Sequence, residues 1–142
     1  MSSEEDVERL LSAAARLNRW VNRHADLELP SAQLRTLALV GDLAPARVGD
    51  LAAADGISQP TMTTALGRLE ASGFVARTVD QADARATLVD LTPAGRLALA
   101  RARAQRTRIL SEALTSLPAG RTKDVRTGAD ALGRLLESLG VP

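Results

Sequence analysis

The clearest candidate for chemistry is a run of short polar side chains at the start of one predicted helix. Ser58 is suited to accept the unpaired N–H groups of a first helical turn, and Pro60 falls where a missing N–H costs little. If Met62, Leu66 and Leu69 face inward, the 3.6-residue period turns the polar residues outward. Such side chains can approach base edges, while the terminal amides meet phosphate. The pattern therefore predicts a DNA contact made by Ser58, Gln59, Pro60, Thr61, Thr63, Thr64 and Arg68.

A second candidate contact is Arg85, on the far side of a predicted β-hairpin. An arginine there can enter a narrow minor groove, where the negative potential is enhanced. Asp83 is predicted to orient an arginine, because a carboxylate facing phosphate would be repelled. The alternatives are that Arg85 is a solvated turn residue and that the helix residues form ordinary surface.

Catalytic and metal chemistry find little support in this chain. It has no cysteine, no tyrosine and no glycine-rich phosphate loop, so we expect no enzyme, no cofactor and no disulfide. The single histidine, His24, lies near Asp26 and Glu28, which is too few good ligands for a metal site. We interpret His24 as an ordinary surface or helix-end residue.

Composition and charge describe an ordinary globular chain of 142 residues, 45% hydrophobic and 25% charged, with a net charge of +1. The start is acidic, whereas 96–108 carries five arginines and no acid. That stretch could be a solvated helix face, a phosphate contact or a partner of the acidic start. No signal peptide is evident and no apolar run reaches the roughly 18 residues of a membrane span, so we expect a cytoplasmic protein.

Four helices are predicted before the hairpin. Apolar residues at three- and four-residue steps predict a helix to about His24, and Ser31 opens a second that ends near Gly41-Asp42, with glycine in the left-handed conformation. A third runs from Arg47 to Asp55-Gly56, and the helix capped by Ser58 ends at Gly73. The last two form a helix-turn-helix.

A hairpin and two long helices complete the predicted fold. Segments 74–79 and 87–91 form the hairpin, and Thr92-Pro93 starts a helix. Its predicted inner stripe is Leu97, Ala100, Ala104, Thr107, Leu110 and Leu114; that of the last helix is Val125, Ala129, Leu132, Leu136 and Leu139. We predict one mainly α domain over 1–142: a winged helix-turn-helix with a small β-hairpin wing (31–92) and dimerisation helices (1–30 and 93–142) that pack on a second chain.

The chain resembles the MarR family of bacterial transcription regulators. The resemblance lies in Val48-Gly49-Asp50-Leu51-Ala52, in Ser58 to Thr63, in Arg68 to Val75, and in Asp80, Asp83 and Arg85 followed by Leu91 to Arg96. It implies a homodimer that binds a pseudo-palindromic operator on double-stranded DNA and represses transcription, with recognition helices in the major groove and wings in the minor groove.

Two positions depart from the family pattern, because members often have arginine where this chain has Thr64 and Ala82. Each lost phosphate contact should lower the salt slope by about 0.9, so we expect weaker nonspecific binding, offset by the arginines after Arg96. The rival hypothesis is a winged-helix protein-interaction module that has lost operator binding. Thr64 and Ala82 favour it, whereas Arg68 and Arg85 count against it.

The resemblance also implies a small aromatic effector bound between the dimerisation helices and the winged unit. The residues expected near such a cleft are Trp20, Val21, Arg23, Leu37 and Ala38. An unfilled seam between the subdomains is an equally good interpretation.

Overall fold

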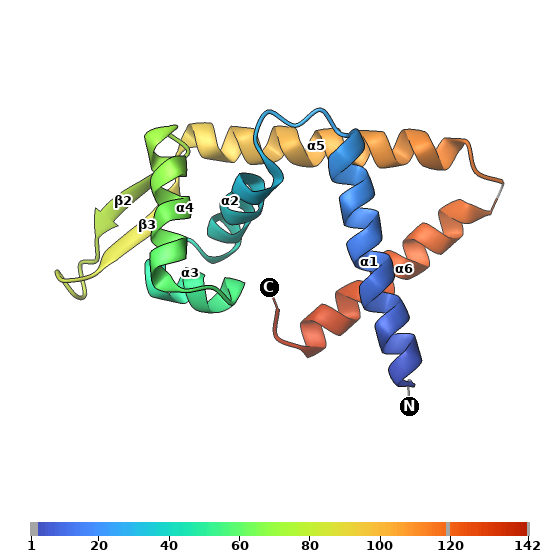
Figure 1. Ribbon diagram of the computed structural model, residues 1–142, viewed down its shortest axis with the longest axis horizontal. Helices are drawn as coiled ribbons and strands as arrows, with labels where there is room; N and C mark the ends of the chain where they lie inside the picture. Colours follow the sequence, from blue (N-terminus) through green and yellow to red (C-terminus); the bar gives the residue numbers. More distant parts are fainter. Residues whose placement is uncertain (1–2, 119, 142) are drawn as a thin grey trace. The chain divides into compact units, whose positions relative to one another are not determined.

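The computed structural model describes residues 3–118 and 120–141, which form helices and three short strands. They divide into two compact units, one of residues 26–105 and one of residues 3–25, 106–118 and 120–141. Within the described ranges, no helix is long and apolar enough to cross a membrane. In chain order the elements are α1 (Glu4–His24), α2 (Ser31–Leu43), β1 (Ala46–Arg47), α3 (Val48–Asp55), α4 (Gln59–Ala71), β2 (Val75–Val79), β3 (Thr87–Leu91), α5 (Pro93–Thr115) and α6 (Arg121–Ser138) (Figure 1).

The 26–105 unit is a winged helix with one continuous hydrophobic core. Helices α2, α3 and α4 pack together and against the sheet, so that each buries one apolar face. The fully buried side chains come from these helices and from β3: Leu37, Val40, Leu51, Met62, Leu66, Leu69 and Val89. This confirms the mainly α winged helix-turn-helix with a β-hairpin wing.

The sheet has three strands rather than the predicted two. β2 and β3 form the expected antiparallel hairpin, with Val75 opposite Leu91 and Val79 opposite Thr87. β1 adds to the other side of β3, with Arg47 opposite Leu88, so the strand order is β1-β3-β2. Two residues are too few to show the alternation of apolar and polar side chains that indicates a strand in a sequence. Only the pairing with β3 therefore identifies β1 as a strand.

The second helix ends close to the predicted Gly41-Asp42, but the predicted role of Gly41 as a left-handed helix stop is wrong. Helix α2 continues to Leu43, and Gly41 is not among the glycines with positive φ. Its small size serves packing instead, because a Cβ there would lie 3.1 Å from Leu99 Cδ2 and 3.3 Å from Leu91 Cδ1. Gly56 and Gly73, in contrast, adopt φ values of 67° and 79° at the two predicted helix ends.

The predicted inner stripe of α5 is wrong for its first four positions. Leu97 is 51% exposed, and Ala100, Ala104 and Thr107 are exposed too, whereas Ala98 and Leu99 belong to the core. Residues 97–104 alternate leucine or arginine with alanine, so their sequence does not favour one helix face over another. The rotation of the helix is instead set at its start, where Gly95 packs against the backbone of Phe74.

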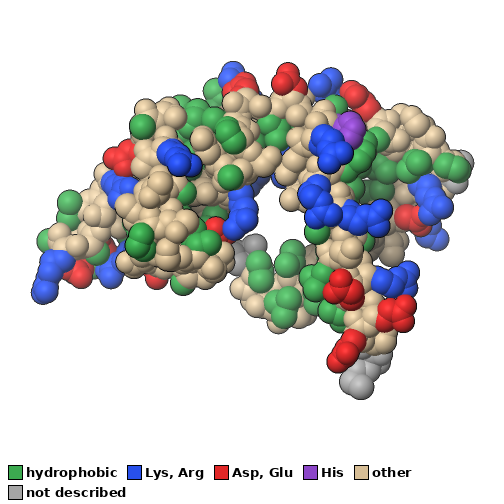
Figure 2. Space-filling view, viewed as in Figure 1, with side chains coloured by type: hydrophobic (Ala, Val, Ile, Leu, Met, Phe, Trp, Pro, Cys, Tyr) green, Lys and Arg blue, Asp and Glu red, His purple; other side chains and the backbone are tan. Residues whose placement is uncertain are grey.

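The terminal helices keep their apolar faces exposed in the single chain. Ser3 caps α1 by accepting the Asp6 N–H, and α1 ends at His24 as predicted. No residue of α6 is buried, and its predicted stripe lies on the surface. The exposed large hydrophobic residues of the two helices include Val7, Leu10, Leu11, Leu17, Trp20, Val125, Leu132, Leu135 and Leu136; Figure 2 shows such side chains gathered on α6.

Candidate nucleic-acid interface

The turn into α4 has the geometry that the sequence predicts. Gly56 ends α3 in the left-handed conformation, and the Ile57 N–H bonds the carbonyl of Ala52 at 3.1 Å. Ser58 then caps α4, its Oγ accepting the Thr61 N–H at 3.3 Å, and Pro60 lies in the first turn. The remaining N–H groups of that turn give the helix start a partial positive charge suited to a phosphate.

The candidate contact residues of α4 all lie on its exposed side. Met62, Leu66 and Leu69 are fully buried and fix the rotation of the helix. The candidate contact residues, in contrast, are exposed to solvent: Ser58, Gln59, Pro60, Thr61, Thr63, Thr64 and Arg68. The structure thus presents them together on one helix, while their contacts with DNA remain a prediction.

Several of these side chains already have partners within the chain. The Thr64 hydroxyl donates to the Pro60 carbonyl at 3.0 Å, and the hydroxyls of Ser58 and Thr61 share a 2.8 Å hydrogen bond. Gln59 lies against α3, since a Cβ on Gly49 would be only 2.5 Å from its Nε2. The exposed surface of α4 is therefore short, and part of its hydrogen-bonding capacity is used internally.

Arg68 lies beside a small pocket that the sequence did not reveal. The pocket has a volume of about 230 Å³ and lies between α2, the end of α3 and α4. Its polar wall is an ion pair in which Arg35 donates to Asp55 Oδ1 from Nη2 at 2.8 Å and from Nε at 3.1 Å. Thr61 and Ala65 line it from α4. Its lining residues come from three separate segments, so no sequence pattern connects them.

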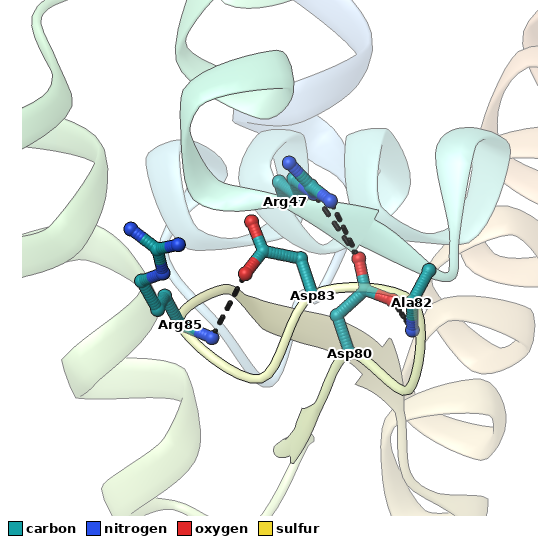
Figure 3. A network of polar contacts seen from close by, with 5 residues as sticks. All are labelled: Arg47, Asp80, Ala82, Asp83 and Arg85. Atoms are coloured by element: carbon teal, nitrogen blue, oxygen red, sulfur yellow. Dashed lines mark hydrogen bonds and ion pairs between the residues drawn. The ribbon is translucent and has the colours of Figure 1, made fainter.

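The wing loop is held by two aspartates. Asp80 Oδ1 accepts the Ala82 N–H at 2.9 Å, and Asp83 Oδ1 accepts the Arg85 N–H at 3.1 Å (Figure 3). The Asp80 N–H also donates to the Ala86 carbonyl at 3.0 Å, closing the loop. Arg85 is exposed, and no dashed line joins its guanidinium to either carboxylate in Figure 3. Figure 2 shows a basic side chain at the tip of the hairpin with acidic side chains nearby.

The aspartate that holds a guanidinium is Asp80, not Asp83 as predicted. Arg47 donates to Asp80 Oδ2 from Nη2 at 2.7 Å and from Nε at 3.2 Å. The hydrogen bond from Arg47 lowers the pKa of the Asp80 carboxyl, and the N–H of Ala82 lowers it further. The same hydrogen bond raises the pKa of Arg47. These residues are 33 positions apart, and they meet because β1 and β2 both pair with β3.

Other arginines of this unit also have acidic or carbonyl partners. Arg77 pairs with Glu70 at 2.7 Å, and Arg96 donates to the Leu91 carbonyl at 3.0 Å. Arg101 lies 3.8 Å from Glu28, and Arg103 lies 3.9 Å from Asp42. Over residues 26–105 the sequence carries eight arginines against nine acidic residues. The unit therefore has no overall basic charge with which to attract DNA.

The five residues predicted to lie near an effector belong to two different units. Trp20, Val21 and Arg23 are in α1, and Leu37 and Ala38 are in α2. Trp20 stacks on His24 with ring centroids 4.3 Å apart, whereas Leu37 is fully buried in the winged-helix core. The effector site remains a prediction. Among residues 3–118 and 120–141, no three His, Asp or Glu side chains are grouped to hold a metal ion.

Comparison with known proteins agrees with this architecture. The MarR family model matches residues 29–87, while a search of curated proteins gives no match. RV1404 from Mycobacterium tuberculosis is 25% identical, with a TM-score of 0.77, over 100% of this chain and 97% of its own. Wild-type MarR from E. coli is 23% identical (TM-score 0.71; 96% and 98% covered). A MepR mutant from S. aureus bound to an oligodeoxyribonucleotide is 19% identical (TM-score 0.64; 98% and 99% covered).

Proposed function

We propose that the chain is a transcription regulator that binds specific sequences of double-stranded DNA, a proposal supported by the match of the MarR family model to residues 29–87. The observation that carries the proposal is the exposed start of α4. Ser58 caps that helix, and its polar residues stand in solvent while Met62 and Leu66 anchor the opposite side. A structural neighbour, the MepR mutant, is bound to an oligodeoxyribonucleotide.

The proposed binding mode uses two elements of each chain. The N-terminal half of α4 enters the major groove, where Gln59 and Thr63 reach base edges. The wing enters the adjacent minor groove through Arg85. Residues 26–105 carry no excess of basic over acidic side chains, so nonspecific affinity for DNA should be low. Specificity then rests on the close approach of the α4 side chains to base edges.

The proposed active form is a homodimer that reads a pseudo-palindrome. The exposed apolar residues of α1 and α6 support this, because a soluble chain rarely leaves so many large hydrophobic residues in water. Half-sites should lie roughly 34 Å apart, about one helical turn. Light scattering should give twice the 14.9 kDa chain mass, and Leu136→Glu should give a monomer; a monomeric wild-type chain would refute the dimer.

Selection of bound fragments from random duplex DNA and from the genome tests the DNA-binding proposal. We expect an enriched pseudo-palindrome, and its fusion to a reporter gene should show repression. Arg85→Ala should weaken binding, whereas Arg16→Ala, which removes an exposed arginine of α1, serves as the matched control. An absence of any enriched sequence would refute the regulator.

The balanced charge of residues 26–105 favours a second candidate, a protein-interaction module without operator binding. Their eight arginines do not outnumber their nine acids, and several already have acidic partners. This candidate predicts that Arg85→Ala leaves any residual DNA affinity unchanged. The same selection experiment therefore decides between the two.

A small aromatic effector that releases DNA is the last part of the proposal. Trp20 offers a direct probe, because the chain contains a single tryptophan. Binding of a phenolic acid near Trp20, Val21 and Arg23 should change its fluorescence and lower DNA affinity together. Unchanged fluorescence and unchanged DNA binding across a panel of phenolic acids would count against the effector.

A further inference from the structure

Arg47 occupies a position from which it can connect the helix-turn-helix to the wing. It is the last residue of β1 and directly precedes α3, but its side chain does not cap that helix. Instead the guanidinium reaches Asp80, the first residue after β2, using both Nε and Nη2. Since β3 lies between β1 and β2, this ion pair connects the two outer strands of the sheet.

Asp80 divides its two carboxylate oxygens between two tasks. Oδ2 accepts both hydrogen bonds from Arg47, and Oδ1 accepts the N–H of Ala82 in the wing loop. Its side chain is only 13% exposed, so the carboxylate is largely covered by these partners. Asn at this position has one acceptor oxygen and could perform only one of the two tasks.

The loop that Asp80 starts is the one that carries Arg85. Asp80 donates its N–H to the Ala86 carbonyl at 3.0 Å, and Ala86 donates to the Asp83 carbonyl at 2.9 Å. The carboxylate of Asp83 in turn accepts the Arg85 N–H (Figure 3). Arg47 thus holds one end of a continuous hydrogen-bonded loop, and the backbone of Arg85 is part of that loop.

We propose that Arg47 and Asp80 are positioning residues for the wing: their ion pair holds the 80–86 loop in the form that presents Arg85 to the minor groove. This inference rests on the proposed DNA-binding function. It assigns Arg47 an indirect role, through Asp80, although an arginine near the helix-turn-helix could also contact phosphate itself.

The sign of the effect of Asp80→Asn separates these two roles. If Arg47 contacts phosphate directly, loss of the Asp80 charge frees Arg47 and removes a repulsive group, so binding tightens. If the pair positions the wing, the same change weakens binding because Arg85 is no longer held. Asp90→Asn is the matched control, since it removes one exposed carboxylate from β3 of the same sheet.

The experiment measures the Kd of the full chain for the duplex obtained by selection, with hydroxyl-radical footprints of the minor groove. We expect Asp80→Asn to weaken binding up to about tenfold, close to the loss in Arg85→Ala, as for one hydrogen bond to a charged group. In a chain that already carries Arg85→Ala, Asp80→Asn should cause no further loss of affinity. Asp80→Asn alone should also weaken the protection of the minor groove by the wing. Asp90→Asn should bind as tightly as the wild type or more tightly.

Tighter or unchanged binding by Asp80→Asn overturns the proposal, and so does a full additional loss in the Arg85→Ala background. If Asp80→Asn fails to fold, Arg47→Lys provides the test, because it keeps the charge but replaces the paired donors with one ammonium group. A wild-type footprint for Arg47→Lys would then overturn the proposal. A wild-type chain that binds no duplex refutes the proposed function itself, a result distinct from either.

Discussion

Replacement of Gly95 by alanine should test how α5 is attached to the winged unit. Gly95 is buried in the first turn of α5, and its N–H donates to the capping hydroxyl of Thr92 at 3.0 Å. A Cβ at this position would lie 2.0 Å from the carbonyl oxygen of Phe74 and 2.9 Å from its carbonyl carbon. Both obstructing atoms belong to the backbone, so no side-chain rotation relieves the overlap.

The expected cost follows from this geometry. Ordinary contact distances are about 3.5 Å, so α5 and the Phe74 backbone would have to separate by more than about 1 Å. Overpacking of this kind costs about 1–3 kcal/mol or more. The hydrogen bonds from Thr92 to the carbonyls of Gly73 and Phe74 would be strained as well, each worth about 1 kcal/mol. Alanine's helix preference returns at most about 1 kcal/mol, leaving a net loss of about 3 kcal/mol.

Thermal denaturation followed by far-UV circular dichroism, at matched chain concentrations, measures this loss. For a chain of this length about 3 kcal/mol corresponds to a fall of about 10 °C in Tm. Gly67→Ala is the matched control, since Gly67 is exposed in the interior of α4 and a Cβ there meets no atom within 4 Å. That variant should be more stable by about 0.5–1 kcal/mol. A Tm for Gly95→Ala at or above the wild-type value would refute the reasoning.

Three further results are expected. Ser58→Ala should lower the free energy of unfolding by about 1 kcal/mol through loss of the helix cap, whereas Ser111→Ala within α5 should not. Equal urea midpoints for the two variants would show that the Ser58 cap does not stabilise the fold. Arg85→Ala should reduce the slope of log K against log salt by about 0.9 for each subunit, or about 1.8 for the dimer, a change that binding at several salt concentrations measures. An NMR titration of the Asp80 carboxyl should give a midpoint below its ordinary value of 3.8, because Arg47 lowers its pKa. The ion pair thus contributes stability above the unfolded-state pKa and loses it as pH falls through the lower folded-state value; a midpoint at or above 3.8 would show that the ion pair is absent in solution.

Local patterns were enough to predict the helix-turn-helix. Ser58 and Pro60 define the start of α4 through backbone requirements that act within one turn. Gly56 and Gly73 mark helix ends because each adopts a positive φ. The inward residues of α4 followed the 3.6-residue period because one face is apolar and the other polar.

Local patterns did not predict the rotation of α5, where more than one face is apolar, or the role of Gly41, whose small size serves packing. In α5 the alternating leucine and alanine of 97–100 fit either face, and the contact of Gly95 with Phe74 decides the rotation. Gly41 resembled a helix stop but makes room for Leu99. Each of these depends on a neighbour that is distant in sequence.

By itself, the sequence determined the elements whose cause is local: the capped start of α4, the hairpin between 74 and 91, and the apolar stripes of the terminal helices. The tertiary structure alone decided which charges meet. Asp80 rather than Asp83 holds an arginine because β1 and β2 both pair with β3, which brings Arg47 within 2.7 Å of Asp80. An ion pair between residues 33 positions apart depends on strand pairing, and so on the free energy of the whole fold, whereas a helix cap depends on a single turn; for that reason only the cap could be predicted in advance.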